Sequence, residues 1–325
     1  MRKSQIIISI IVLILILTSI SACASNNKSF EDNGKIKIVA TLFPQYDFAK
    51  EIVKDRGEVI LLLPAGVEAH SYEPTPQDIG SIRNADVFLY TGEYMEPWAE
   101  KIIKNIGTGD IIAVDLSQGI ELLDEEEEDD EHDHHDNHDD HDGHHHGGKD
   151  PHIWLDPIYA QKMVDDIVEA VVRADGKNED FYRENGEKYK EELKELDREF
   201  EETFEKTEHE TIIYGGHFAF GYFTKRYGLD HISPYNGFTP NAEPSPKRIT
   251  ELMENMKTLG INTIYYEELI DPKVARVISE QTGAKMLLLH GAHNISKEEL
   301  ESEISYIEIM EGNLERLKQG LVYNE

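Results

Sequence analysis

Short runs of β-branched and aliphatic residues alternate with segments of helical spacing along most of the chain, and this alternation limits the possible folds. Continuous apolar runs of this kind suit strands that are covered on both faces. Strands that alternate with helices form α/β layers, in which helices flank a mainly parallel sheet. The runs lie at 36–42, 59–63, 87–90, 111–114, 211–215, 263–266 and 286–289. The sequence therefore predicts an α/β fold with mainly parallel sheets.

The length of the chain predicts two lobes, because it has 325 residues and single domains usually hold about 100–200. Apolar residues recur every three or four positions along the charged segment 179–206, which indicates one face of a long helix. A helix of about 25 residues is about 40 Å long and can join two lobes. We expect a first lobe at 35–178, a linker helix at 179–206 and a second lobe at 207–325.

The N-terminus has the layout of a secretory signal peptide. A basic start and an apolar run at 6–17 precede the sequence Ile-Ser-Ala-Cys, which ends at Cys23, the only cysteine. The run is shorter than the roughly 20 residues that a spanning helix needs. The ending resembles a bacterial lipobox, which implies removal of 1–22 and lipidation of Cys23; an uncleaved anchor with an incidental thiol is the alternative. The polar segment 23–34 then serves as a tether.

These N-terminal features predict that the folded part works outside the cytoplasm. A lipid anchor would hold it at the extracellular face of the cytoplasmic membrane, or on the periplasmic side if a second membrane exists. The formal net charge of −33 excludes nucleic acid as a partner, because an acidic surface repels it and attracts cations.

Much of the negative charge lies in the segment 124–149, which interrupts the α/β pattern. Nothing apolar is available there to offset the entropy of ordering it, so we expect a disordered loop. Its interleaved aspartates and histidines suit weak auxiliary binding of metal ions, and a merely solvated insertion is the alternative. The eight histidines are His132, His134, His135, His138, His141, His144, His145 and His146.

Outside this loop, several histidines follow a predicted strand or lie between a strand and a helix. In open α/β sheets, ligands gather at the carboxyl ends of the strands. Imidazole favours zinc, copper or nickel over calcium, magnesium or manganese, so a site rich in nitrogen points first to Zn²⁺. We interpret His209 and His231 as ordinary surface or hydrogen-bonded residues. The candidates are His70, His152, His217, His290 and His293.

Six sequence blocks resemble those of the metal-binding lipoproteins of bacterial ABC importers that take up zinc or manganese. They are FPQYDFAKEI, LLLPAGVEAHSYEPTPQDI, DPHIWLDP, GGHFAFGYFTKRYGL, NAEPSPKRI and INTIYYEE. The resemblance covers roughly residues 36 to 320 and implies two α/β lobes joined by one long helix, with the metal held between them. It implies His70, His152 and His217 as ligands. Manganese members tend to carry a carboxylate at the third position, so His217 favours zinc.

The fourth ligand position departs from the family, which commonly has an acidic residue there. Alignment of the Asn-Ile-Ser turn puts His293 at this position, with His290, a carboxylate or water as alternatives. Four neutral imidazoles would leave a charge of +2 with a divalent ion. Nearby acids are candidates to orient the ligands: Glu68, Glu243, Glu267 and Glu268.

The resemblance implies a monomeric receptor, not an enzyme, that captures one Zn²⁺ ion tightly and delivers it to a cognate ABC permease and its ATPase. A manganese or iron receptor of the same kind is the alternative. A surface zinc hydrolase with three histidines and a bound water is a further one, but the chain lacks the HExxH pattern. The sequence leaves open a contribution to cell adhesion.

Overall fold

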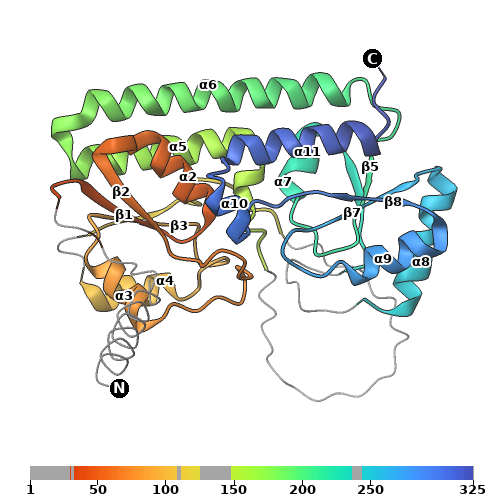
Figure 1. Cartoon of the computed structure of the whole chain (residues 1–325), viewed down its shortest axis with the longest axis horizontal. Coiled ribbons are helices and arrows are strands. Elements are labelled where there is room, and N and C mark those ends of the chain that lie inside the picture. The colour runs from red at the N-terminus through yellow and green to blue at the C-terminus, as the bar shows by residue number, and fades with distance from the viewer. Residues whose placement is uncertain (1–29, 31–32, 108–110, 125–147, 236–243, 325) are drawn as a thin grey trace, which may run out of the picture.

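The computed structural model describes residue 30 and residues 33–107, 111–124, 148–235 and 244–324. The predicted signal peptide, Cys23, most of the tether and the eight loop histidines lie outside these residues. Within them, no helix combines the length and the apolar character needed to cross a bilayer. Two groups of strands and helices lie side by side beneath one long helix (Figure 1).

The first lobe contains a four-stranded parallel sheet in the order β2-β1-β3-β4. The strands are β1 (Ile36–Ala40), β2 (Gly57–Leu61), β3 (Val87–Tyr90) and β4 (Ile112–Asp115). Consecutive residues of β1 and β3 are buried, as expected for strands covered on both faces. Strand β1 ends two residues earlier than predicted, because the chain turns at Thr41 and Leu42 into a helix that begins at Phe43.

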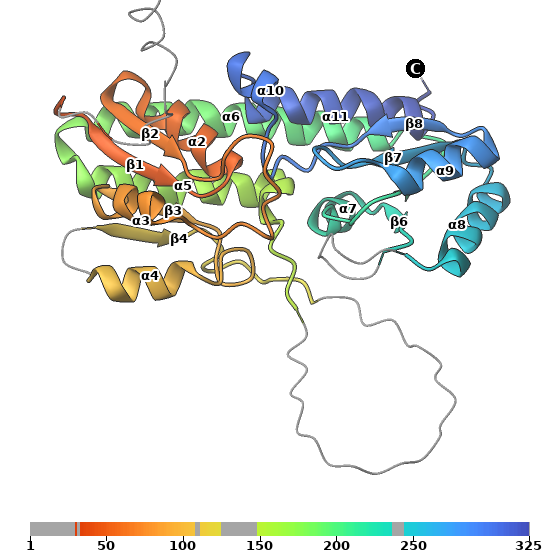
Figure 2. The same ribbon diagram turned by 60° about the horizontal axis from the view of Figure 1, so that its bottom comes forward.

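Helices α2 (Phe43–Val53), α3 (Pro76–Arg83) and α4 (Ala99–Ile106) flank this sheet, as Figure 2 shows from below. The start of α3 illustrates how the sequence sets these helices. Thr75 accepts a hydrogen bond from the Asp78 backbone, and the Asp78 carboxylate accepts one from the Thr75 backbone at 2.9 Å. This reciprocal cap satisfies two backbone groups at the helix start.

The second lobe repeats the strand order of the first. Its strands are β5 (Thr211–Ile213), β6 (Asp230–Ile232), β7 (Thr263–Tyr266) and β8 (Lys285–Leu288). Parallel pairs β5–β6 and β7–β8 are joined by a parallel bridge between Tyr214 and Tyr265. The resulting order β6-β5-β7-β8 matches β2-β1-β3-β4, so the carboxyl ends of the strands collect at one edge in each lobe.

Helices α7 (Gly221–Tyr227), α8 (Pro246–Leu259) and α9 (Lys273–Thr282) complete the second lobe. Strand β6 was not among the predicted strands, because its three residues include Asp230 and His231 and offer too little apolar pattern. His231 nevertheless packs well: its ring stacks on a phenylalanine ring with the two centroids 3.7 Å apart.

The helix α6 (Glu179–Phe204) runs along both lobes (Figure 1) and packs against α2, α7 and α5 (Pro157–Ala174). Its apolar stripe faces the protein, and the buried members are Tyr182, Tyr189, Leu193, Leu196 and Phe200. Helix α5 follows a short 3-10 helix, η3 (Ile153–Leu155), and is capped by Asp156, whose side chain accepts the Ile158 N–H. The α/β fold with two lobes and a long helix is therefore confirmed.

The C-terminal segment forms two helices, α10 (Lys297–Glu301) and α11 (Tyr306–Gly320). Helix α11 lies along α6 and also contacts α2 of the first lobe. The chain thus returns to the first lobe after β8. The lobe boundaries at 35–178 and 207–325 stay a prediction.

Candidate metal centre

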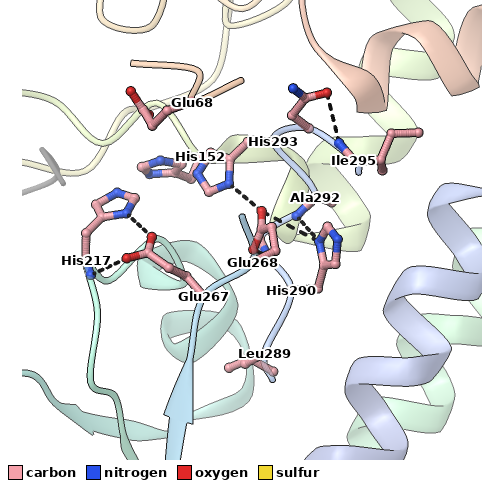
Figure 3. Close-up of polar contacts among 12 residues, drawn as sticks. Glu68, His152, His217, Glu267, Glu268, Leu289, His290, Ala292, His293 and Ile295 are labelled. Carbon is pink, nitrogen blue, oxygen red and sulfur yellow. Dashed lines mark hydrogen bonds and ion pairs between the residues drawn. The ribbon is translucent and has the colours of Figure 1, made fainter. Parts of the chain in front are cut away.

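Four imidazoles from distant parts of the chain converge between the lobes. The candidate ligand atoms of His70, His152, His217 and His293 all lie within 4.8 Å of one another. The Nε2 atoms of His70 and His152 are 3.2 Å apart. Figure 3 shows the rings of His152, His217 and His293 together with the carboxylates that contact two of them. These four are the histidines that the sequence and the resemblance put first.

His70 lies in the loop between β2 and α3. The Glu68 carboxylate accepts hydrogen bonds from the backbone N–H groups of His70 and Ser71, at 2.7 and 2.8 Å. Glu68 therefore closes the turn that carries His70, so it orients the ligand through the backbone.

His152 precedes η3 and is held by Asp150, a residue that the sequence argument did not single out. Asp150 Oδ1 accepts the His152 backbone N–H at 2.9 Å and lies 2.7 Å from His152 Nδ1. Burial raises the pKa of Asp150 to about 7. The only sequence signal was a carboxylate two positions before a histidine, which is too common to be informative.

The two residues that flank the histidine-rich segment 124–149, Leu123 and Asp150, are held together beside His152. The Tyr222 hydroxyl, on α7, donates to the Asp150 carbonyl at 2.7 Å and accepts from the Leu123 N–H at 3.0 Å. The Asp150 N–H donates to the Leu123 carbonyl at 2.9 Å. One side chain of the second lobe therefore joins both ends of the segment.

His217 follows β5 and is held by Glu267, which follows β7. Glu267 accepts the His217 backbone N–H at 3.2 Å with one oxygen, and its other oxygen lies 3.1 Å from His217 Nδ1. A Cβ atom at Gly216 would lie 2.7 Å from the Glu267 carboxylate. The glycine before His217 thus permits the carboxylate to approach.

His293 lies in the loop after β8 and is held by Glu268. Glu268 Oε1 lies 3.1 Å from His293 Nδ1, and Oε2 accepts the Gly291 N–H at 2.7 Å. Burial would raise the pKa of Glu268, but the neighbouring His290 and His293 outweigh it and lower this pKa to about 2. Glu267 and Glu268 therefore contact ligand rings as expected, whereas Glu243 lies outside the described residues.

His290 lies outside the cluster of four. Its Nδ1 accepts the Ala292 N–H at 3.0 Å, and its Nε2 lies 3.5 Å from a Glu299 oxygen. Its backbone exchanges two hydrogen bonds of 2.8 Å with the Asn313 side chain on α11. These contacts use the ring and backbone of His290 to join the loop to α10 and α11.

Burial keeps two of the four imidazoles, those of His70 and His152, neutral. Burial, with smaller contributions from His293 and His217, lowers the pKa of His70 to about 2. Burial also lowers the pKa of His152 well below its ordinary value. A neutral imidazole offers the lone pair that a metal ion requires.

The donor set fits a divalent ion that prefers nitrogen. The Nε2 atoms of His217 and His293 are buried and have no hydrogen-bond partner among the described residues. An unsatisfied buried polar atom costs about 1–3 kcal/mol, which a metal ion at this position would offset. The Nδ1 atoms of His152, His217 and His293 face carboxylates, an arrangement that fixes the ring and raises its basicity as a ligand.

Trp154 covers the site from the first lobe. Its side chain is fully buried, and its ring centroid lies 5.4 Å from those of His152 and His293. Its indole N–H donates to the Gly291 carbonyl at 2.8 Å. The indole therefore excludes water from one side of the cluster and holds the loop that carries His293.

Known proteins are similar to this chain in sequence and in architecture. The family described as zinc-uptake complex component A, periplasmic (ZnuA), matches residues 38–320. The high-affinity zinc uptake system protein ZnuA of Bacillus subtilis (strain 168) is 40% identical over 306 residues, 93% of this chain and 94% of that protein. The zinc-binding protein AdcA of Streptococcus pyogenes serotype M18 is 33% identical over 289 residues, and the chain spans 56% of its length.

Solved structures give the same result. The metal-dependent lipoprotein YcdH of Bacillus subtilis is 38% identical, with a TM-score of 0.74 over 89% of this chain and 100% of that one. The Zn(II)-bound ZnuA-like domain of Streptococcus pneumoniae AdcA is 30% identical, with a TM-score of 0.73 over 89% of this chain and 99% of that one. The chain therefore belongs to the ZnuA family of zinc-uptake complex components.

Proposed function

We propose that this protein is an extracytoplasmic receptor that captures one Zn²⁺ ion tightly between its lobes and delivers it to an ABC permease. The observation that carries the proposal is the convergence of His70, His152, His217 and His293. Four protein ligands with no open position suit the holding of zinc rather than its use in catalysis. The zinc-uptake and zinc-binding relatives support the same cargo.

The ligand chemistry favours zinc over manganese and iron. Manganese prefers carboxylate and carbonyl oxygens, whereas imidazole suits zinc, copper and nickel. Here the carboxylates of Asp150, Glu267 and Glu268 bond to the Nδ1 side of the rings and leave the Nε2 atoms to face one another. Negative charge thus balances the ion without entering its coordination shell.

We further propose that the receptor works as a monomer, held to the membrane only by lipid on Cys23, with a cognate permease and its ATPase as partners. The order of basic start, apolar run and cysteine supports the anchor, as does the lipoprotein description of a Bacillus subtilis structure. The eight histidines at 132–146 are proposed as weak auxiliary zinc sites.

A surface zinc hydrolase is the less favoured function. It would need three histidine ligands and a bound water with a carboxylate base nearby. His293 occupies the place where that water would bind, and Glu267 and Glu268 already hold ligand rings. Among the described residues, this arrangement favours a closed site with four ligands over an open position with a free carboxylate base.

Elemental analysis and X-ray absorption of the mature protein, after dialysis against a weak chelator, test the receptor proposal. We expect one retained zinc ion with four nitrogen ligands at about 2.0–2.1 Å. His217→Ala should weaken zinc binding in a calorimetric titration. A wild-type affinity that is micromolar or weaker and unchanged in this variant would refute the proposal, whereas zinc-dependent ester or peptide turnover by the pure protein would favour the hydrolase.

A further inference from the structure

The loop that carries His293 follows β8 of the second lobe, yet its backbone is bonded to the first lobe. The Phe43 N–H at the start of α2 donates to the His293 carbonyl at 3.2 Å. The Gly66 N–H, in the loop after β2, donates to the Ile295 carbonyl at 2.8 Å. The backbone at His293 and at Ile295, two residues later, is therefore anchored to first-lobe elements.

Side chains add to this anchoring. The buried Asn294 amide donates to the Pro64 and Val67 carbonyls at 2.7 and 2.9 Å. The Trp154 indole donates to the Gly291 carbonyl at 2.8 Å. Because Pro64 and Val67 belong to the loop that leads to His70, these bonds fix two candidate ligands against each other.

At residues 291–295 the attachment to the second lobe is narrower, because Glu268 bonds to Gly291 and His293 through its side chain. The residues before them are bonded within the second lobe. The Leu289 N–H donates to the Tyr266 carbonyl at 2.9 Å, and the His290 backbone exchanges two hydrogen bonds of 2.8 Å with the Asn313 side chain. If β7 withdrew, His293 would lose its carboxylate partner but would keep its backbone position on the first lobe.

His217 is attached in the opposite way. It follows β5, and its hydrogen bonds within the described part of the chain run to Glu267, which follows β7. The residue before it is held in the same lobe, because the Ser233 hydroxyl donates to the Gly216 carbonyl at 2.9 Å. Figure 3 shows His217 and Glu267 together on one side, apart from His293 and Glu268.

We propose that His217 is the ligand whose departure releases the zinc ion, while His70, His152 and His293 stay together as one three-imidazole face of the first lobe. This inference rests on the proposed receptor function. Removal of one ligand converts a closed zinc site into one with an open position, where water or a permease group can bind. A small displacement of the second lobe then suffices for release, because a single ligand leaves.

The test compares zinc affinity and chelator-triggered zinc release in His70→Ala, His152→Ala, His217→Ala and His293→Ala. A preorganised three-imidazole face retains more affinity than two of its members with one mobile ligand. We expect His217→Ala to lose the least zinc affinity of the four variants. Its loss should be about tenfold smaller than that of His152→Ala, a difference of about 1.4 kcal/mol. It should also release zinc faster than the wild type. Losses in His217→Ala equal to or greater than those in His152→Ala would overturn the inference.

A double-mutant cycle gives an independent test. Asn294→Ala cuts two bonds between the His293 loop and the first lobe, so it should matter more when His217 no longer holds the ion. We expect the combined loss in His217→Ala/Asn294→Ala to exceed the product of the single losses. Losses that simply multiply would overturn the inference.

Two controls keep the outcome interpretable. Thermal unfolding of the metal-free variants identifies any that fail to fold, and His217→Gln and His152→Gln then replace the alanine variants, because an amide has a similar size and polarity. A wild-type protein that binds zinc weakly would refute the receptor function itself. A tight wild type with equal losses at all four histidines would refute only the special role of His217.

Discussion

Glu268 Oε1 lies 3.1 Å from His293 Nδ1, so the histidine predicted at the fourth ligand position is itself paired with an acid. The negative charge of the Glu268 carboxylate thus stays in the site, but the His293 ring separates it from the proposed metal position. The same carboxylate accepts the Gly291 N–H at 2.7 Å. It therefore fixes both the ring and the backbone of the fourth candidate ligand.

Glu268→Gln should weaken zinc binding by about 10–100-fold, because residues that orient a ligand ring typically contribute that much to metal affinity. The amide keeps the size of the side chain but removes the charge that orients His293. Competition with a chelating dye measures the effect. Glu280→Gln, which changes an exposed glutamate on α9, is the matched control. An affinity that equals that of the control would show that Glu268 does not position His293.

His293→Glu should shift selectivity from zinc toward manganese, because a carboxylate oxygen is the ligand type that manganese prefers. We expect the ratio of zinc to manganese affinity to fall, with manganese binding rising in absolute terms. Titrations of both ions into the wild type and the variant measure the ratio.

His290→Ala should leave the coordination number of bound Co²⁺ unchanged, since His290 lies outside the cluster of four histidines. The visible absorption spectrum of the cobalt-loaded protein measures it, and a changed spectrum would identify His290 as a ligand.

Zinc affinity should depend on pH less steeply than for four ordinary imidazoles, which have pKa values near about 6.5. Burial lowers the pKa of His70 to about 2 and that of His152 well below its ordinary value. These two rings stay neutral as the pH falls from about 7 to about 5.5, so protons do not compete with zinc there. Competition titrations across this range measure the slope; a slope that corresponds to the release of four protons for each zinc ion bound would contradict the prediction.

Glu96→Gln should flatten the pH dependence of stability. Burial outweighs the bonds from Thr41, Thr91 and Gly92 and raises the pKa of Glu96 from 4.5 to about 7. Between these values the folded protein holds a proton that the unfolded chain releases, so stability falls as the pH rises, by roughly 3 kcal/mol. The amide carries no such proton. Urea unfolding of both metal-free proteins at the two ends of this range measures the difference; parallel curves would contradict it.

Removal of residues 125–147 should lower the number of zinc ions bound per protein molecule without loss of the tight site. The deletion keeps Leu123 and Asp150, which pair with each other and with Tyr222. Zinc titration with elemental analysis counts the bound ions in both forms. A stoichiometry of one in each would remove the idea that the segment scavenges zinc.

The sequence predicted the fold well where a run of apolar residues was flanked by polar ones. The run at 87–90 coincides with β3, and the alternation of strands and helices indicated the α/β class. Strand β6 was missed because three residues with two polar members produce no pattern that stands out from a loop. Strand β1 ended early because the apolar run continues through Leu42 into the start of α2, and an apolar pattern alone does not mark where a strand gives way to a helix.

Within the site, the histidines were predictable and their partners only partly so. A histidine after a strand marks a position where ligands gather, and the order of strands then brings four of them together. Glu267 and Glu268 could be named because they directly follow a predicted strand. Asp150 could not be identified, because its role depends on the turn that brings its oxygen to His152 Nδ1. The choice between His290 and His293 likewise required the contacts of Asn313 and Glu299.

The Tyr222 hydroxyl hydrogen-bonds to both Leu123 and Asp150 and so holds together the two ends of the segment between them. We expect a change of the sequence between these two ends to leave His152 in place, because the contacts of Tyr222 and Asp150 lie between the segment and the His152 ring. This junction therefore makes an insertion site, where a peptide of different length or composition, such as a fluorescent reporter, can replace the segment while zinc binding is retained.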